Sequence, residues 1–160
     1  MIYCAGVANL QVSTAYAAAL SGGYDGTFTA MQDVLVYALS KNGQTVEFMT
    51  YLGGTNDDVG NGISISGSNI FVCGSTSSSD FPVTNGSGGT TAAFDNSLGG
   101  TQDGFVAVFD NTLSQLTYCS YIGGAGVDEA LTIRATGTNT FDISLHSYSS
   151  LPTSSPNYLV

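Results

Sequence analysis

Short runs in which apolar and polar residues alternate recur along the chain, and they predict β-strands. The apolar runs at residues 34–40 and 104–110 are rich in β-branched and aromatic side chains. Each is followed by a turn composition and then by a second run, at residues 45–52 and 115–122. We therefore expect two hairpins with tight turns.

Two further segments, residues 60–75 and 129–147, alternate in the same way around a break that contains Gly and Asn, and each predicts another hairpin. Helix is nearly absent. Only residues 15–20, with the sequence AYAAAL, favour a single helical turn.

A shift of seventy residues aligns the second and third parts of the chain without a gap. The motif TYLGGTNDD at residues 50–58 falls on SYIGGAGVD at residues 120–128. The first residues look like the tail of a preceding copy, because IYCAG at residues 2–6 matches FVCGS at residues 71–75 and places Cys4 on Cys73. The expected organisation is a remnant at 1–30, comprising a lone strand and a loop, followed by units at 31–100 and 101–160.

Four short strands in each unit predict an antiparallel meander, and a four-stranded sheet repeated in tandem is typical of a β-propeller blade. The fold class expected is therefore all-β, with about two and a third blade-like units. A β-solenoid and a two-sheet sandwich are the alternatives. Solenoid coils are shorter than this repeat, and a sandwich gives no reason for the repetition.

Residues 51–82 closely resemble the SBBP-type β-propeller repeat of large bacterial cell-surface and secreted proteins. The resemblance comprises the Tyr-Leu-Gly-Gly stretch, the acidic pair, the Gly-Ser-Asn turn before an aromatic strand, and the Asp-Phe-Pro element. GGTQDGFVAVFD at residues 99–110 matches a further element of that repeat. The resemblance implies a propeller fold but no particular activity. A closed ring needs at least ~4 blades, so we expect an incomplete ring.

Charge excludes some classes of partner. The chain has two Lys and Arg residues against twelve Asp and Glu residues, for a net charge of −10. Nucleic acids and anionic membrane surfaces are bound mainly through Lys and Arg clusters, so neither is expected as a partner. The sequence has no stretch of 18 or more apolar residues, so we expect no membrane span. A surface poor in cations and rich in Ser, Thr, Asn and Gly favours an extracellular or cell-surface location.

Several residues are candidates for a site. Asp57 and Asp58, with Asn56 and Asn61, form a candidate calcium shell, although turn architecture explains the same pattern. Three cysteines cannot all pair within one chain, and we expect all three as small core residues. Asn85 lies in the sequon Asn-Gly-Ser and is a candidate glycosylation site.

Catalytic chemistry has little support. His146 is the only histidine, and neither a nucleophile-elbow motif nor a zinc-ligand spacing is present. We therefore expect no enzymatic activity, and no cofactor other than the calcium considered above.

Unpaired blade edges and apolar blade flanks need to be covered. We expect copies of the chain to self-associate into a filament or a ring, with strand addition through Ile2, Tyr3, Cys4, Ala5 and Gly6. The alternative is a binding module for a glycan or a protein, from a large surface adhesin. Its site would comprise the loop at residues 77–89 with Tyr148 and Tyr158.

Overall fold

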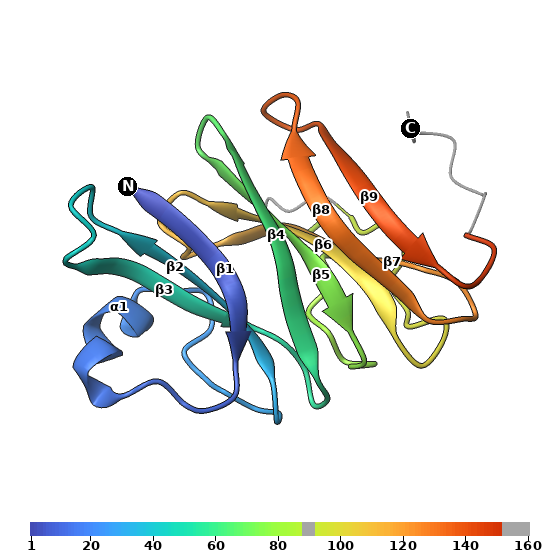
Figure 1. Cartoon of the computed structure of the whole chain (residues 1–160), viewed down its shortest axis with the longest axis horizontal. Helices are drawn as coiled ribbons and strands as arrows, with labels where there is room; N and C mark the ends of the chain where they lie inside the picture. Colours follow the sequence, from blue (N-terminus) through green and yellow to red (C-terminus); the bar gives the residue numbers. More distant parts are fainter. Residues whose placement is uncertain (88–91, 152–160) are drawn as a thin grey trace.

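The computed structural model describes residues 1–87 and 92–151, and within them nine strands form three antiparallel sheets. The first sheet has the order β1-β2-β3, the second β4-β5-β6-β7 and the third β8-β9. The bounds are β1 Ile2–Ala8, β2 Asp33–Leu39, β3 Val46–Leu52, β4 Asp58–Ser66, β5 Asn69–Thr76, β6 Asp103–Asp110, β7 Leu116–Ile122, β8 Asp128–Ala135 and β9 Phe141–Ser147. A 3₁₀ turn, η1 (Thr14–Tyr16), and a short helix, α1 (Ala17–Ser21), follow β1. Figure 1 shows the three sheets side by side.

The all-β fold of incomplete propeller-like blades is confirmed. The sheets are nevertheless offset from the sequence repeat by two strands. The second sheet takes β4 and β5 from one repeat and β6 and β7 from the next, because the short connection at residues 53–57 carries the chain from the first sheet to the second. The four strands of one sequence unit therefore do not form one sheet, and consecutive sheets are tied together by the chain itself.

The strand at the N-terminus pairs in a different register from the one that the sequence match predicted. Ala5 lies opposite Val36, and Cys73 lies opposite Val106. Ala5, and not Cys4, is therefore the structural equivalent of Cys73. A slip of one residue moves a side chain to the other face of a sheet. Cys73 and Cys119 are buried as expected, whereas Cys4 is only half-buried.

The turn between β8 and β9 is one residue longer than its equivalent between β4 and β5. Ile65 pairs with Ile70 across the shorter turn, and Ala135 pairs with Phe141 across the longer one. The seventy-residue match without a gap is therefore wrong at this turn. As a result, Asp142 occupies the place in β9 that the buried Phe71 occupies in β5.

Two apolar layers hold the three sheets together. The layer between the first and second sheets includes Val36, Leu52 and Phe105, and the layer between the second and third includes Phe71 and Ile133. The layer between the first and second sheets holds more of the aromatic groups. The rings of Phe81 and Phe105 lie 4.8 Å apart there. Burial of these faces is the main favourable contribution to folding.

The outer face of the first sheet is covered by the chain itself. Leu20 of α1 packs with Met49 and Tyr51 of β3, and the ring of Phe28 lies 5.7 Å from that of Tyr51. Figure 1 shows α1 on the side of this sheet that faces away from the second sheet. The expectation of an open apolar flank was wrong here, because residues between β1 and β2 supply the covering layer.

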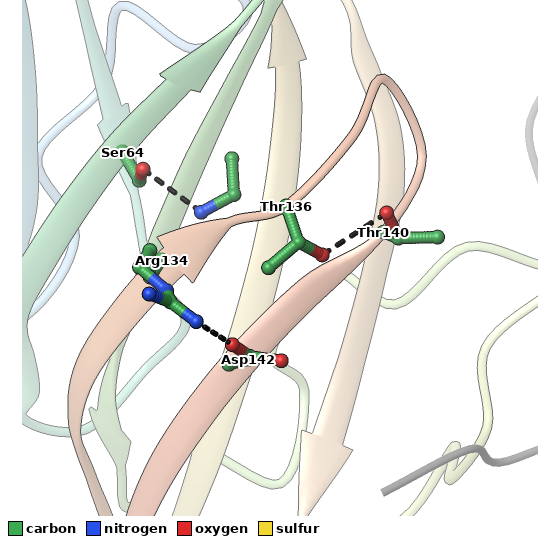
Figure 2. A network of polar contacts seen from close by, with 6 residues as sticks. Ser64, Arg134, Thr136, Thr140 and Asp142 are labelled. Carbon is green, nitrogen blue, oxygen red and sulfur yellow. Dashed lines mark hydrogen bonds and ion pairs between the residues drawn. The ribbon is translucent and has the colours of Figure 1, made fainter.

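The outer face of the third sheet is polar. Arg134 of β8 forms an ion pair with Asp142 of β9 (Figure 2). The hydroxyl groups of Thr132 and Ser144 lie 2.8 Å apart. On the inner side, the N–H of Ala135 donates to the Ser64 hydroxyl of the second sheet. The second expected flank is therefore not apolar either. Because the turn is one residue longer, the polar residues of β9 face outward. The outer face of a capping repeat is polar in the same way.

Tyr51 and Tyr121 lie near the ends of β3 and β7 and are buried. Both hydroxyl groups hold a connecting segment. The Tyr51 hydroxyl accepts from the N–H of Val12 at 2.7 Å. The Tyr121 hydroxyl donates to the carbonyl of Ser78 at 2.6 Å and accepts from the N–H of Phe81 at 3.1 Å.

The substitution Tyr121→Phe should lower the free energy of unfolding by about 1–3 kcal/mol, because the buried carbonyl of Ser78 and the N–H of Phe81 would keep only the long hydrogen bond of 3.4 Å between them. Urea unfolding followed by circular dichroism measures this loss. Tyr148→Phe is the matched control, since the Tyr148 side chain is exposed and should tolerate the change. Equal stability of the two variants would contradict the structural role of the Tyr121 hydroxyl.

Candidate functional site: buried carboxylate pairs and open strand edges

Four aspartates begin strands at the junctions between sheets. Asp33, Asp58, Asp103 and Asp128 are the first residues of β2, β4, β6 and β8, and each is at most 1% exposed. The N–H of Asp58 donates to the carbonyl of the residue before Asp33 at 2.8 Å, and the N–H of Asp128 donates in the same way to the residue before Asp103 at 2.9 Å. Asp33 and Asp58 therefore form one junction pair, and Asp103 and Asp128 form another.

Glycines make room for the first pair. A Cβ atom on Gly53 would stand 2.5 Å from Asp33 Oδ1 and 2.8 Å from Asp58 Oδ2, so a larger residue cannot occupy this position without a shift. The N–H of Gly54 donates to Asp58 Oδ2 at 2.8 Å. Gly124 repeats this bond to Asp128 at 2.7 Å. The recurrence of Gly-Gly in the two motifs is therefore explained by the carboxylates that they enclose.

In each of the four carboxylates, one oxygen accepts hydrogen bonds and the other accepts none. Their Oδ2 atoms accept backbone N–H groups at 2.7–2.9 Å, from Thr29, Gly54, Gly99 and Gly124 respectively. Their Oδ1 atoms make no hydrogen bond, and they are the buried side-chain oxygen and nitrogen atoms without a partner in the described part of the chain. Unsatisfied buried groups are rare, and each calls for a physical explanation.

Burial raises the pKa of three of these carboxyl groups. The pKa of Asp58 rises to about 6, mainly through burial and with a contribution from Asp33, against the opposing effect of the polar groups of Thr76, Gly54 and Ser78. Burial also raises the pKa of Asp33 and of Asp103. Burial acts in the same direction on Asp128, but hydrogen bonds outweigh it and its pKa is lowered.

The calcium shell expected from the sequence is not brought together. Asp57 is exposed whereas Asp58 is buried, so the two carboxylates do not converge. The side-chain amide of Asn56 donates to the Ser77 carbonyl, and that of Asn61 donates to Glu129 in the third sheet. No group of three or more His, Cys, Asp and Glu side chains that suits a metal ion occurs within residues 1–87 and 92–151.

Asp33 is a functional candidate that the sequence analysis did not connect to Asp58. The two residues are 25 positions apart, and only the neighbouring starts of β2 and β4 bring them together. A usable signal was that Asp33 and Asp58 both recur seventy residues later, as Asp103 and Asp128.

Each of the three sheets in the described part of the chain has two edge strands, and β1 and β9 are two of these six. β1, which includes the expected assembly residues Ile2–Gly6, pairs only with β2, and β9 pairs only with β8. β1 carries no charged side chain, and Ile2 and Val7 are 47% and 40% exposed. Beside β9, apolar side chains are only half-buried, namely Phe141, Ile143 and Leu145 of β9 and Tyr118 and Ile122 of β7.

The remaining candidates lie apart from these features. Asn85 is exposed, and its Oδ1 accepts from the N–H of Ser87 at 3.0 Å; residues 88–91 of the same loop lie outside the described residues. His146 is exposed on β9, with its ring 4.7 Å from that of Tyr148, and Tyr158 also lies outside the described residues. None of the described helices is long and apolar enough to cross a membrane.

Residues 47–82 match the model of the SBBP family, which is a beta-propeller repeat, and this confirms the resemblance over that segment. The match runs from β3 through β5 and includes Gly53, Gly54 and Asp58. Repeats of this family occur in bacterial surface proteins and indicate a non-enzymatic repeat module. A search of curated proteins found no match to the chain.

We expect the stability of the protein in metal-free buffer to fall by about 2 kcal/mol as the pH rises from about 4 to about 6. The folded protein holds the Asp58 proton more tightly than the unfolded chain does, because the folded pKa is raised to about 6. Ionisation in this range therefore costs the folded state stability. Urea unfolding at a series of pH values in EDTA measures the effect.

Asp58→Asn has no proton to lose and should flatten this dependence, whereas Asp57→Asn, a change in the exposed neighbour, should leave it intact. If both variants keep the dependence of the wild type, its origin lies elsewhere than Asp58.

Proposed function

We propose that the chain is a non-enzymatic extracellular structural repeat module that self-associates by strand addition. The observation that carries the proposal is β1, a seven-residue strand without charge at the edge of a sheet. Natural edge strands are usually defended by Lys, Pro or a bulge, and β1 has none of these along its pairing with β2.

Assembly through the faces of the sheets is not favoured by this structure. The outer face of the first sheet is covered by α1 and the segment around it, and the outer face of the third sheet carries the Arg134–Asp142 ion pair. Burying that ion pair against a further blade would cost desolvation energy. The edges are therefore the surfaces through which copies can join at least cost.

The partner edge that fits β1 best is β9 of a second copy. The third sheet has two strands where the second sheet has four, so it has room for strands beside β9. A strand added there would also cover Phe141, Ile143 and Leu145. Contact between β1 of one copy and β9 of the next is heterologous, and it makes a filament unless the rotation closes a ring. The acidic surface, poor in cations, and the occurrence of the repeat in bacterial surface proteins support an extracellular location.

Ile2→Lys places a charge on the edge of β1 and should convert assemblies into monomers, as measured by size-exclusion chromatography with light scattering and by negative-stain electron microscopy. Leu131→Lys is the matched control. Leu131 is an apolar residue on β8 that is 42% exposed, close to the 47% of Ile2, and it lies on neither of the two strands proposed to join, β1 and β9. The control variant should assemble as the wild type does.

A point substitution is preferable to deletion of residues 1–8. Tyr3 and Ala5 pack against the apolar layer between the first and second sheets, so their removal would destabilise the first sheet. A wild-type chain that stays monomeric at every concentration would refute self-association. It would instead favour a binding module, for which the exposed aromatic pair of His146 and Tyr148 is the candidate contact surface.

A further inference from the structure

We propose that Asp33 and Asp58 share one proton, and that this proton makes the contact between the first and second sheets sensitive to pH. The two residues begin β2 and β4 and are at most 1% exposed. Asp33 Oδ1 and Asp58 Oδ2 lie 2.5 and 2.8 Å from one point, the position of a Cβ on Gly53. Two buried carboxyl groups therefore meet at a place where no side chain separates them.

The unpaired oxygen of Asp33 is explained if it carries this proton. Asp33 Oδ1 accepts no hydrogen bond from the described residues, whereas Oδ2 accepts from the N–H of Thr29. A protonated carboxyl group is a donor as well as an acceptor. Its O–H can donate to the Asp58 carboxylate beside it, so that a buried atom without a partner gains one. A proton also needs no space of its own, and the two carboxyl groups already fill the point where they meet.

No cation of the chain itself neutralises this pair. The chain has two Lys and Arg residues. Arg134 pairs with Asp142 on the outer face of the third sheet, and Lys41 follows the end of β2 opposite to Asp33. Two like charges at close range repel strongly where water is excluded, so the pair keeps a proton to a higher pH than an isolated carboxyl group does.

The other titratable groups around the pair are anionic or neutral. Burial raises the pKa of Asp33, and the charge of Asp25, in the segment before β2, adds to this effect. Hydrogen bonds lower the pKa of Asp80 in the segment after β5, so it is a further negative charge near the junction. On β7, burial raises the pKa of Cys119 and of Tyr121, so both stay protonated and neutral. None of these groups competes with a proton for the pair.

The contact between the sheets depends on the same two residues. The N–H of Asp58 donates to the carbonyl of Gln32, next to Asp33, at 2.8 Å. The pKa of Asp58 is raised to about 6, first by burial and also by Asp33. When two carboxyl groups interact closely, their protons leave in steps that belong to the pair. Loss of the shared proton leaves two buried charges beside this hydrogen bond, so a higher pH should loosen the contact.

The second junction provides an internal control. A Cβ on Gly123 would lie near Asp103, and Asp128 is not among the three closest atoms. Burial raises the pKa of Asp103. In Asp128, polar groups that include Gly124 and Ser149 outweigh the effect of burial and lower the pKa. Asp103 and Asp128 should therefore lose their protons in separate steps.

NMR of the Asp carboxyl carbons in the whole chain, titrated with pH in EDTA, tests the sharing. We expect the carboxyl carbons of Asp33 and Asp58 to shift together in one step near pH 6. Asp33→Asn imitates the protonated form of Asp33, so in this variant the step of Asp58 should move toward the ordinary value of ~4. Asp57→Asn, the same change at an exposed neighbour, should leave the joint step in place.

Amide hydrogen exchange measures the contact itself. The protection factor of the Asp58 N–H should fall in the wild type as the pH rises through the joint step. In Asp33→Asn it should stay constant over the same range, because this variant never places two charges at the junction.

Circular dichroism checks that Asp33→Asn folds, and the wild-type spectra alone decide the proposal where it does not. Separate steps for Asp33 and Asp58 in the wild type would overturn the proposal. So would a step of Asp58 at the same pH in the wild type and in Asp33→Asn. Ile2→Lys should titrate as the wild type does, so the result is independent of whether the chain self-associates.

Discussion

Every face of a stacked β-sheet has to be covered or made polar, and this constraint explains most of the structure. Apolar layers cover both faces of the second sheet, which therefore has buried side chains on either side, such as Phe105 and Phe71. The first and third sheets have a neighbour on one side only. The chain meets the constraint at its two ends differently, with a covering segment around α1 at one end and polar residues on β9 at the other.

The polar outer face of the third sheet depends on the one extra residue in the turn between β8 and β9. With the shorter turn found between β4 and β5, β9 would present Phe141 and Ile143 where β5 presents Phe71 and Cys73, and the outer face would be apolar. The longer turn moves these side chains inward against the second sheet, and Asp142 and Ser144 point outward. A change of one residue thus decides whether a further sheet can stack there.

The sequence predicted the strands, their hairpins and the propeller-like class, because periodicity and turn composition are local signals. Register was less accessible. Cys4 was matched to Cys73 because identical residues outweigh a shift of one position, yet Ala5 is the structural equivalent. The covering role of the segment around Leu20 was missed, since its short helix has little periodicity and its partner Met49 lies far along the chain.

The site was recovered only in part for the same reason. Asp58 was singled out, but with its neighbour Asp57, although adjacent residues in extended backbone point in opposite directions. The true neighbour is Asp33, and it is reached through the meeting of two strand starts in different sheets.

The pair of Asp33 and Asp58 and the open edge of β1 both involve the first sheet. The junction of Asp33 and Asp58 lies between the connection at residues 53–57 and the first strand of the second sheet, so a charge left uncompensated there weakens the contact between two sheets. The open edge of β1 lies on the same first sheet. In the proposed assembly, the edge of β1 would carry force from a neighbouring copy, and the first sheet would pass this force to the second sheet across their contact. In that assembly, a load on the edge of β1 would therefore also act on the contact at the buried pair, although the pair and the edge do not touch.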